Sequence, residues 1–429
     1  MEITGLPGFR DFDPGRLALR RHIVETWRCV ARRYGFAEYD GPPLEPLELY
    51  TRKSGPEIVA QLYGFTDKGG REVALRPEMT PTFARMIAAR AAALPKPIRW
   101  FSIPQLFRYE RPQRGRLREH FQLNMDIVGE VGVGGDAEVI AAAVDCLRAL
   151  GLEASDIVAR VSDRRLMAGV LKSLRVPETV LPEVFGVLDR AERESASSVV
   201  DRLAALGLSA HTAERILATV GVDLDGLERQ CGADETVGEA VVRLRELFTC
   251  LGQLGVGEYV EFDAGLVRGL AYYTGMVFEI WERSGKLRAI CGGGRYDSLL
   301  ASLGGPDLPA AGFGMGDVVL GELLLDRGLV PEPVPAIQDF VVPVSARERA
   351  LALRLVQMLR SSGRRVAYDF RQRAVGKQFR AADQAGAERV IVLGPEEAAR
   401  GTVKVRTLAT GEEMEVSMEE LTGWPTTED

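Results

Sequence analysis

The sequence predicts an α+β protein with an antiparallel sheet core, a helical insertion and a C-terminal α/β domain. Three observations support this class. Short apolar runs separated by turn residues fill the first part of the chain, and helical periodicity without a strand pattern fills residues 166–247. After a proline cluster near residue 333, short strands alternate with helices. The length of 429 residues allows roughly three compact units.

Residues 1–165 are expected to form the first part of the core. Apolar residues at helical spacing predict a helix from Leu17 to Tyr34 that ends at Gly35. The turn residues Asp67 to Gly70 lie between two short apolar runs and predict a hairpin. The further elements expected here are a helix over 81–94 with Thr80 as its N-cap, strands over 98–107 and 121–128 joined by a charged loop, and a helix over 136–150.

The rest of the chain divides into three expected parts. Residues 166–247 form the helical insertion, residues 248–330 complete the core, and residues 336–429 form the C-terminal domain after a proline-rich linker. The elements expected in the last two parts are strands over 259–262 and 272–281, a glycine-rich segment over 291–297 followed by a helix to about Arg327, and strands over 340–344, 365–368 and 390–393.

Composition excludes several classes of protein. No apolar run approaches the roughly 18 residues that cross a bilayer, and the first residues lack a secretion signal, so we expect a cytoplasmic protein without membrane contact. Five scattered cysteines without a CxxC pair and only three histidines argue against a disulfide scaffold and a zinc site. Because the net charge is −7, any contact with nucleic acid must use local basic patches.

A cluster of five arginines faces one acid, Glu110, between residues 108 and 118. Guanidinium groups grip phosphate oxygens in pairs and stay charged at any working pH, so the cluster suits a polyphosphate ligand. The alternative is a solvated basic hairpin, although arginines carried by a rigid hairpin can converge on one ligand. The five arginines are Arg108, Arg111, Arg114, Arg116 and Arg118.

A second cluster, residues 265–275, sets Arg268 among glycines and ends in the pair Tyr272 and Tyr273. Tyrosines with close backbone approach are typical of a pocket for a small aromatic or imidazole substrate. Because neighbouring strand residues point to opposite faces, at most one of the two tyrosines should reach a pocket unless the strand is bulged, and both could instead belong to the core. The glycine-rich residues 292–297 match neither a Walker loop nor a dinucleotide fingerprint.

Together these segments resemble the histidyl-tRNA synthetases, which are class II aminoacyl-tRNA synthetases. The resemblance extends over nearly the whole chain and implies the class II sheet core, the helical insertion and a C-terminal anticodon-binding domain. Its segments are Phe107 to Gln113 with Arg116 and Gln122 for motif 2, Leu266 to Gly275 for the histidine signature, Gly293 to Asp297 with Gly312 to Gly316 for the approach to motif 3, Pro43 for the motif 1 proline, and Leu75 to Thr80 for the end of the histidine-site strand.

The resemblance also implies a role for individual residues. Arg108 and Arg268 would act as catalytic cations beside the α-phosphate of ATP, with Arg116 at the outer phosphates and Glu110 also at the ATP site. Glu78 would accept from the imidazole N–H of histidine, while Gln122 and Asp126 suit its ammonium group. The complete expected histidine site is Glu78, Thr80, Gln122, Asp126, Tyr272, Tyr273 and Tyr296.

The implied reaction is ligation of L-histidine to tRNA(His) by a homodimer that uses ATP and Mg²⁺ and forms histidyl-adenylate. It needs no nucleophilic side chain, no tightly bound prosthetic group and no metal site of the protein's own, because the substrate carboxylate attacks and fixed cations stabilise the charge at phosphorus. The main alternative is a non-catalytic paralogue, such as the regulatory subunit of ATP phosphoribosyltransferase. A general RNA-binding module would leave the histidine-site residues unexplained.

Two positions depart from the usual family pattern. Val319 stands where motif 3 usually has an arginine that contacts ATP, and Ala271 stands where many members have an aspartate. The cyanobacterial and plant-organelle branch of the family resembles this chain at both positions. Arg288 and Arg295 are candidates to supply the missing cation.

The C-terminal domain has its own indication of a nucleic-acid partner. Residues 345–380 contain ten basic and two acidic residues, which is typical of a phosphate-binding surface inside an acidic protein. A helix with a solvated basic face is the alternative. The residues expected to bind tRNA are Arg364, Arg371, Arg373 and Lys377.

Overall fold

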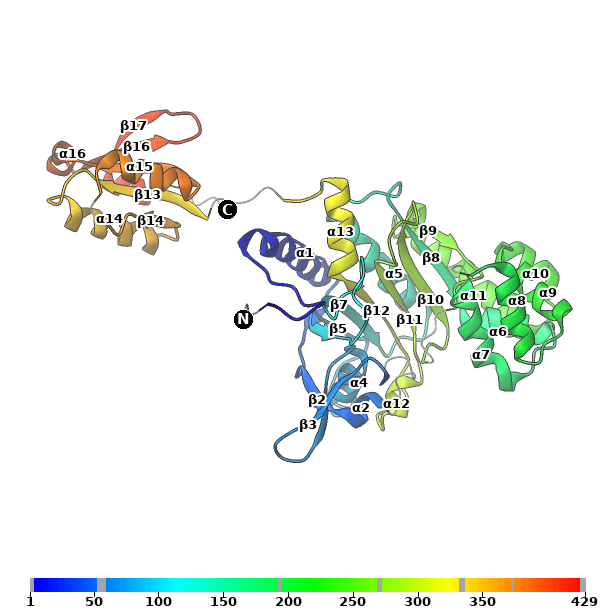
Figure 1. Ribbon diagram of the computed structural model, residues 1–429. Helices are drawn as coiled ribbons and strands as arrows, with labels where there is room; N and C mark the ends of the chain where they lie inside the picture. The colour runs from blue at the N-terminus through cyan, green and yellow to red at the C-terminus, as the bar shows by residue number, and fades with distance from the viewer. Residues whose placement is uncertain are drawn as a thin grey trace. The chain divides into compact units, whose positions relative to one another are not determined.

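The protein, seen here as a computed structural model, forms two compact units, Met1–Pro331 and Glu332–Asp429 (Figure 1). The structure describes residues 4–51, 59–191, 194–267, 272–331, 336–371 and 373–424. Arg268 and Ala271, which the sequence analysis singled out, lie outside the described residues. Among the described residues, no helix combines the length and apolar character needed to span a membrane.

A large sheet is the centre of the first unit. Its neighbouring strands are antiparallel except for the pairs β1/β5 and β8/β9, which confirms the predicted antiparallel core. The strands that the structure describes are, in spatial order, β1 (Ala37–Glu38), β5 (Ile98–Ser102), β7 (Glu119–Val128), β12 (Ala310–Gly316), β11 (Cys291–Arg295), β10 (Met276–Glu282), β8 (Ile157–Asp163) and β9 (Val260–Phe262), with β6 (Gln105–Phe107) paired to β7.

Strand β7 shows how the sheet separates core from site. Its residues Leu123, Met125 and Ile127 are buried in the main hydrophobic core, which also includes α1 (Pro14–Arg33) and α5 (Val133–Arg148). Because side chains alternate along a strand, the residues between and beside them face the other side of the sheet. Helix α1 begins three residues before the predicted start, because the Asp13 side chain accepts from the backbone N–H of Arg16 and caps the helix.

A small three-stranded sheet of described residues holds the predicted hairpin, β3 (Tyr63–Thr66) and β4 (Glu72–Leu75), with β2 (Leu44–Pro46) beside β4. Helices α2 (Leu47–Thr51) and α4 (Thr80–Ala88) accompany it. The expected N-cap at Thr80 is wrong, because the first helical hydrogen bond runs from the N–H of Phe83 to the carbonyl of Met79. The helix also ends at Ala88 rather than at residue 94, since the N–H groups of Arg90 and Ala93 bond carbonyls three residues back.

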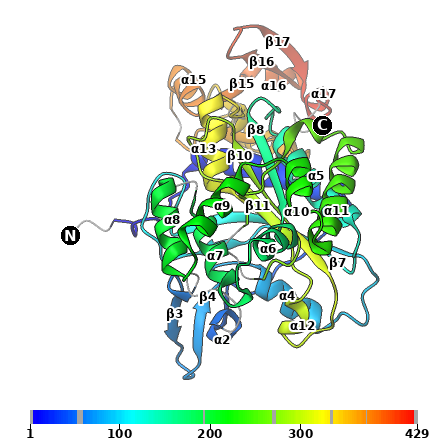
Figure 2. The same cartoon turned by 90° about the vertical axis from the view of Figure 1, so that its right-hand side faces the viewer.

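The stretch predicted to be helical is a group of helices beside the large sheet (Figures 1 and 2). Side chains such as Ser195, Ser209 and Asp223 accept backbone N–H bonds at helix starts, which explains why the chain breaks into short helices there. The helices are α6 (Arg164–Ser173), α7 (Leu181–Leu188), α8 (Ala196–Ala205), α9 (Ala210–Val220), α10 (Leu224–Cys231) and α11 (Glu235–Gln253).

Three further features of the first unit differ from the sequence analysis. Strand β8 was not predicted, and the predicted strand over 98–107 is two strands, separated at Ile103 and Pro104. The helix expected after Asp297 is wrong, because that stretch contains α12 (Leu299–Ser302), strand β12 and only then α13 (Asp317–Arg327). Strands β11 and β12 are rich in glycine, a residue that is depleted in strands, so propensity does not reveal them.

The second unit is an α/β domain in which the three predicted strands are present. Strands β16 and β17 extend its sheet as antiparallel additions that the sequence analysis did not find. The described strands are, in spatial order, β14 (Val366–Tyr368), β13 (Ile337–Pro343), β15 (Ala387–Leu393), β16 (Thr402–Thr407) and β17 (Glu413–Ser417). The described helices are α14 (Arg349–Ser361), α15 (Val375–Gln384), α16 (Pro395–Arg400) and α17 (Met418–Thr422).

Candidate functional site

The candidate site lies on the face of the large sheet that α1 and α5 leave uncovered. Gln122 and Asp126 of β7 project on this face, opposite the core residues of the same strand. The neighbouring strand β12 offers glycines beneath them: a Cβ at Gly312 would collide with Asp126 Oδ1, and one at Gly314 would lie 2.8 Å from Gln122 Cδ. The glycines of β12 therefore make room for the side chains of Asp126 and Gln122, which pack directly over its backbone.

At one end of this face is a cavity of about 320 Å³ with cationic walls. Arg108 donates from Nε to the carbonyl of Pro77 at 2.9 Å, and Arg116 donates from Nη2 to Glu110 Oε1 at 2.7 Å, so both guanidinium groups are anchored by the protein. The residues that line the cavity are Arg108, Glu110, Arg116, Leu117, His120, Gln122, Glu279, Arg288, Ala289, Ile290, Cys291, Val318 and Val319, together with several glycines.

His120 is a cavity residue that the sequence analysis missed. Burial, with the positive charges of Arg108 and Arg10, lowers the pKa of its imidazole to about 3. The flat imidazole ring is therefore neutral at physiological pH, although the guanidinium groups beside it are charged. Its position two residues before Gln122 on the same strand face is the signal that could have identified it.

Two other arginines of the 108–118 segment, Arg114 and Arg118, contact protein groups and do not line the cavity. Arg114 forms 2.9 Å ion pairs with Glu322 and Asp326 of α13, and the backbone N–H of Gly115 donates to Glu322 at 3.0 Å. Gly115 has φ of 71°, a left-handed conformation that glycine adopts at little cost. Arg118 donates to the carbonyl of Glu110 and lies over the Tyr109 ring. The tip of the loop is thus fastened to α13.

At the other end of the site, aromatic rings surround a buried carboxylate. Asp126 is 4% exposed and accepts a hydrogen bond from the hydroxyl of Tyr296, and burial raises the pKa of Asp126 to about 7. The ring of Tyr272 has its centroid 4.9 Å from that of Tyr273 and 5.9 Å from that of Tyr296. This arrangement sets one buried, hydrogen-bonded carboxylate beside a cluster of three tyrosine rings.

Both neighbouring tyrosines reach this cluster, although the sequence analysis expected at most one. The reason is that β10 begins at Met276, so Tyr272 and Tyr273 precede the strand and need not alternate. Tyr273 lies against β11, where a Cβ at Gly294 would be 2.8 Å from its ring.

Two further expected histidine-site residues come from the segment between β4 and α4. Glu78 is buried, and Thr80 is the first residue of α4 and partly exposed. Arg76 anchors this segment by donating from Nε to the carbonyl of Gln105 at 3.0 Å and from Nη1 to Asp40 at 2.9 Å. Since Arg108 bonds the carbonyl of Pro77, the segment lies at the boundary with the cationic cavity.

The two candidates for the missing motif 3 cation have different positions. Arg288 lines the cavity near Val319, which is buried close to Gly115. The prediction for Arg295 is wrong: this residue projects from the opposite face of β11, is 1% exposed and bonds Asp136 of α5. Its guanidinium cannot reach the cavity through the sheet.

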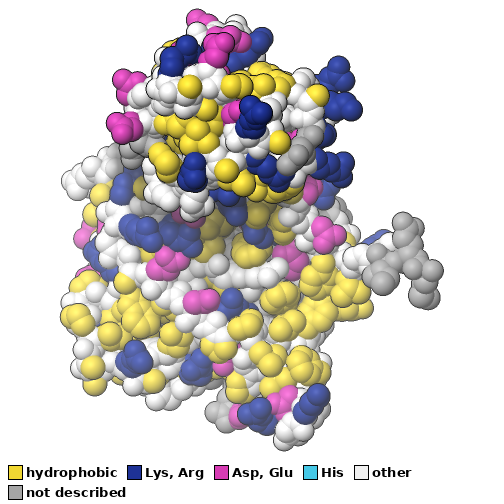
Figure 3. All heavy atoms as spheres, turned by 90° about the vertical axis from the view of Figure 1, so that its left-hand side faces the viewer, with side chains coloured by type: hydrophobic (Ala, Val, Ile, Leu, Met, Phe, Trp, Pro, Cys, Tyr) yellow, Lys and Arg dark blue, Asp and Glu magenta, His cyan; other side chains and the backbone are white. Residues whose placement is uncertain are grey.

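The C-terminal unit has a cavity of about 250 Å³ whose wall includes Arg349, Arg371 and Arg373. Lys377 is exposed on α15, whereas Arg364 is 3% exposed and forms a buried ion pair with Asp339, which directs its charge into the domain. Figure 3 shows Lys and Arg side chains next to apolar ones on the face of this unit that it presents.

Phe370 was missed in this unit, although it lies within the basic segment. It is 79% exposed, with its ring centroid 5.1 Å from that of Tyr368. An exposed aromatic among arginines is typical of a surface that stacks bases, and the sequence Tyr368 to Arg373 already carries that pattern.

Comparison with known proteins gives consistent matches for both units. The family model described as Histidyl-tRNA synthetase matches residues 8–316, and the model described as Anticodon binding domain matches residues 338–425. The histidine–tRNA ligase of Opitutus terrae is 46% identical over 422 residues, which are 97% of this chain and 96% of that protein. The chloroplastic/mitochondrial histidine–tRNA ligase of Arabidopsis thaliana is 40% identical over 98% of this chain and 86% of that protein.

Solved structures share the fold. The crystal structure of histidyl-tRNA synthetase from Nostoc sp. PCC 7120 superimposes with a TM-score of 0.83 at 27% identity and covers 99% of this chain and 98% of that one. The structure of an ATP phosphoribosyltransferase regulatory subunit/histidyl-tRNA synthetase from Bacillus halodurans has a TM-score of 0.77 at 23% identity and covers 92% and 99%, respectively.

Proposed function

Since the chain belongs to the histidyl-tRNA synthetase family and ligates histidine to tRNA, we propose that histidine and ATP occupy the two ends of the site on the large sheet. The observation that carries this proposal is that β7 presents Gln122 beside the arginine-lined cavity and Asp126 inside the aromatic cluster. The carboxylate of histidine must meet the α-phosphate, so its amino-acid end belongs near Gln122.

This orientation assigns the imidazole ring to Asp126. Four residues along a strand separate Asp126 from Gln122 by about 13 Å between Cα atoms, so the two side chains serve opposite ends of the substrate. The ring would fit among Tyr272, Tyr273 and Tyr296 and donate its N–H to Asp126. Glu78, Thr80 and Gln122 would then receive the ammonium group, which exchanges the roles that sequence reasoning gave to Glu78 and Asp126.

ATP would lie in the cationic cavity with its phosphates between Arg108 and Arg116. The substrate carboxylate and a phosphate oxygen repel by about 4 kcal/mol at 4 Å and an effective dielectric constant near 20, and fixed cations offset this repulsion. Arg268 would provide a further cation at the α-phosphate, and Glu110 holds Arg116 in place. Mg²⁺ would enter with ATP as the counterion of its phosphates.

The base of ATP has apolar and flat neighbours in the same cavity. The neutral His120 ring would stack on adenine, and Val319 would form an apolar wall where the usual arginine is absent. Arg288 would supply the compensating positive charge. No protein nucleophile takes part, so the chemistry is positioning and charge stabilisation.

The C-terminal unit would bind the tRNA. Arg371, Arg373 and Lys377 would contact phosphates, and Phe370 would stack on an unpaired base. Arg364 is left out of this surface because of its buried ion pair with Asp339.

Several further expectations remain part of the proposal. The functional division is residues 1–165 and 248–330 for the catalytic core, 166–247 for the insertion and 336–429 for anticodon binding. The chain would act as a homodimer in the cytoplasm, where histidine, ATP and tRNA are present. Sedimentation of the purified protein would test the dimer, and a monomer that retains full activity would contradict it.

The direct test of the reaction is histidine-dependent exchange of pyrophosphate into ATP. We expect exchange with histidine and with no other standard amino acid, followed by charging of tRNA(His). Absence of exchange would favour the alternative of a non-catalytic paralogue. The intact Arg108 and Arg116 and the match of residues 338–425 to an anticodon-binding domain argue against that alternative.

A further inference from the structure

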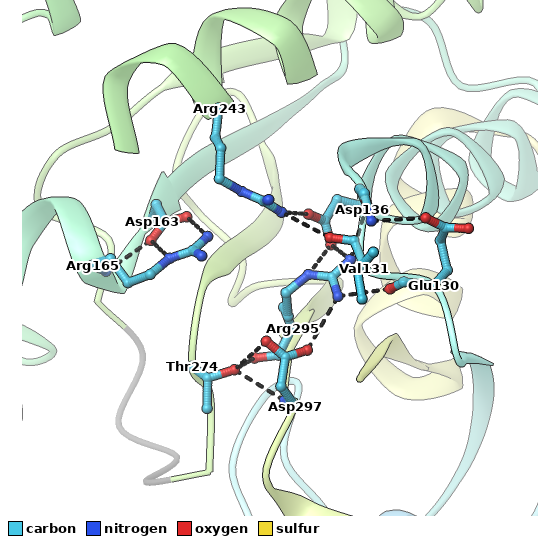
Figure 4. A network of polar contacts seen from close by, with 10 residues as sticks. Glu130, Val131, Asp136, Asp163, Arg165, Arg243, Thr274, Arg295 and Asp297 are labelled. Atoms are coloured by element: carbon cyan, nitrogen blue, oxygen red, sulfur yellow. Dashed lines mark hydrogen bonds and ion pairs between the residues drawn. The ribbon is translucent and has the colours of Figure 1, made fainter. Parts of the chain in front are cut away.

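A network of charged side chains surrounds the buried pair Arg295 and Asp136 (Figure 4), and Arg295 projects from the face of β11 opposite the candidate site. Its centre is Arg295 of β11, and its outermost member in the insertion is Arg243 of α11. The cavity assigned to ATP is not lined by the guanidinium groups of Arg243 and Arg295 or by the Asp136 carboxylate between them. The network therefore needs a different explanation from phosphate binding.

Arg295 joins three segments of the chain. Its Nε donates to Asp136 Oδ1 at 2.9 Å, its Nη1 donates to the carbonyl of Glu130 at 2.9 Å, and its Nη2 donates to the carbonyl of Gly132 at 3.1 Å. Glu130 and Gly132 form the turn that directly follows β7, the strand of Asp126. The guanidinium also bonds Asp297 at 3.1 Å.

The same contacts hold the walls of the histidine pocket. The carbonyl of Arg295 accepts from the N–H of Thr274 at 2.7 Å, and Thr274 Oγ1 accepts from the N–H of Asp297 at 3.0 Å. Tyr296, whose hydroxyl bonds Asp126, lies between Arg295 and Asp297 in the chain. Thr274 directly follows Tyr273. A shift of Arg295 would therefore move both aromatic walls.

The insertion reaches this network through Asp136. One oxygen of its carboxylate bonds Arg295, and the other lies 3.6 Å from Arg243 Nη2. Arg243 also donates to the carbonyl of Val131 at 3.4 Å, in the same turn after β7. A second contact runs from the backbone N–H of Arg164, at the start of α6, to the carbonyl of Gly275 at 3.0 Å.

We propose that Arg243 is a positioning residue for histidine. It links the insertion to Asp136 and Arg295, and through these two residues it fixes the positions of Thr274 and Tyr296. It does not touch the substrate, and it acts by fixing the two walls between which the imidazole ring lies. This inference rests on the proposed placement of histidine in the aromatic cluster.

The chain offers a matched control on the same helix. Arg245 is also a partly exposed arginine of α11, but its partners Asp225 and Glu228, each at 2.7 Å, belong to the insertion itself. Arg243→Ala should raise the KM for histidine about three- to thirtyfold, with the KM for ATP within about twofold of the wild type. Arg243→Lys, which keeps the charge, should recover most of the loss, and Arg245→Ala should match the wild type.

Pyrophosphate exchange measures all of these constants, and thermal unfolding of the two alanine variants shows whether they differ in stability. The inference is supported if the KM for histidine rises while the KM for ATP does not, and if this happens in Arg243→Ala but not in Arg245→Ala. An unchanged KM for histidine, an equal rise in both KM values, or the same response in Arg245→Ala would overturn it while leaving the proposed function intact. A wild type without histidine-dependent exchange would overturn the proposed function and this inference together.

Discussion

The two ends of the site share one strand and one sheet face, yet they differ in charge and in access to solvent. The nucleotide end has guanidinium groups that remain partly exposed, and Arg116 keeps a third of its side-chain surface. The histidine end has a buried carboxylate among tyrosine rings. With the ligands placed as proposed, phosphate binding would depend on fixed cations, whereas histidine recognition would depend on desolvation of a single acceptor.

The largest expected effect tests whether both ends function without the C-terminal unit. A chain that ends at Pro331 should keep pyrophosphate exchange within about threefold of the full chain, because both ends lie in the first unit. It should lose tRNA charging efficiency by on the order of 10³-fold, because the phosphate contacts of the basic surface are removed. Exchange and aminoacylation assays on both proteins measure this, and undiminished charging would exclude the basic surface from tRNA binding.

Arg108→Ala should break the nucleotide end alone. Loss of a cation at the reacting phosphate should lower kcat for exchange by about 10²- to 10³-fold, with a small change in the KM for histidine. Arg111→Ala is the control, since Arg111 is exposed and is not among the residues that line the cavity. Equal kcat values in the two variants would remove Arg108 from the mechanism.

Asp126→Asn should break the histidine end alone. An amide offers the imidazole N–H a weaker acceptor in a buried site, so the KM for histidine should rise by about 10- to 100-fold while the KM for ATP stays unchanged. Steady-state exchange at varied histidine and varied ATP separates the two constants. A rise in the KM for ATP of the same size would show that the two ends do not act separately.

The same carboxylate should make histidine binding depend on pH. Because the pKa of Asp126 is raised to about 7, the acceptor is charged above that pH and becomes protonated as the pH falls below it. Between pH 8 and pH 6 the wild type should lose about tenfold in histidine affinity relative to Asp126→Asn, which shows only the titration of the substrate. Parallel pH profiles of the two proteins would contradict this assignment.

Val319→Arg should have the smallest effect, because we expect Arg288 to supply the missing charge already. Insertion of a long cation where valine is buried costs strain and desolvation, so activity should change by about threefold or less, and downward. Val319→Ile serves as the control for size. An inactive wild type whose exchange is restored by Val319→Arg would instead favour the degenerate-paralogue alternative.

The sequence predicted those parts of the fold that local signals encode. The β3–β4 hairpin has turn residues between apolar runs, and the insertion has helical periodicity with polar caps. The sequence did not reveal β11 and β12, because their glycines make room for side chains from distant parts of the chain: Gly312 for Asp126 and Gly294 for Tyr273. Long-range clashes of this kind leave no local pattern.

Prediction of the site from the sequence was limited in the same way, because contacts between distant residues leave no local pattern. The arginine cluster predicted a polyphosphate cavity, but only the structure separates Arg108 and Arg116, which line it, from Arg114, which pairs with α13. The opposite direction of Arg295 follows from its register on β11, which could not be known before that strand was recognised. Neighbours in sequence can therefore serve opposite faces of one sheet.

The glycine floor beneath Gln122 and Asp126 also sets the direction in which the enzyme can be engineered. A floor made of backbone has no side-chain atoms left to remove, and an added methyl at Gly312 would meet Asp126. A substitution at Gly312 or Gly314 would therefore displace Asp126 or Gln122, so redesign for another amino acid must start from the tyrosine rings and leave these glycines unchanged.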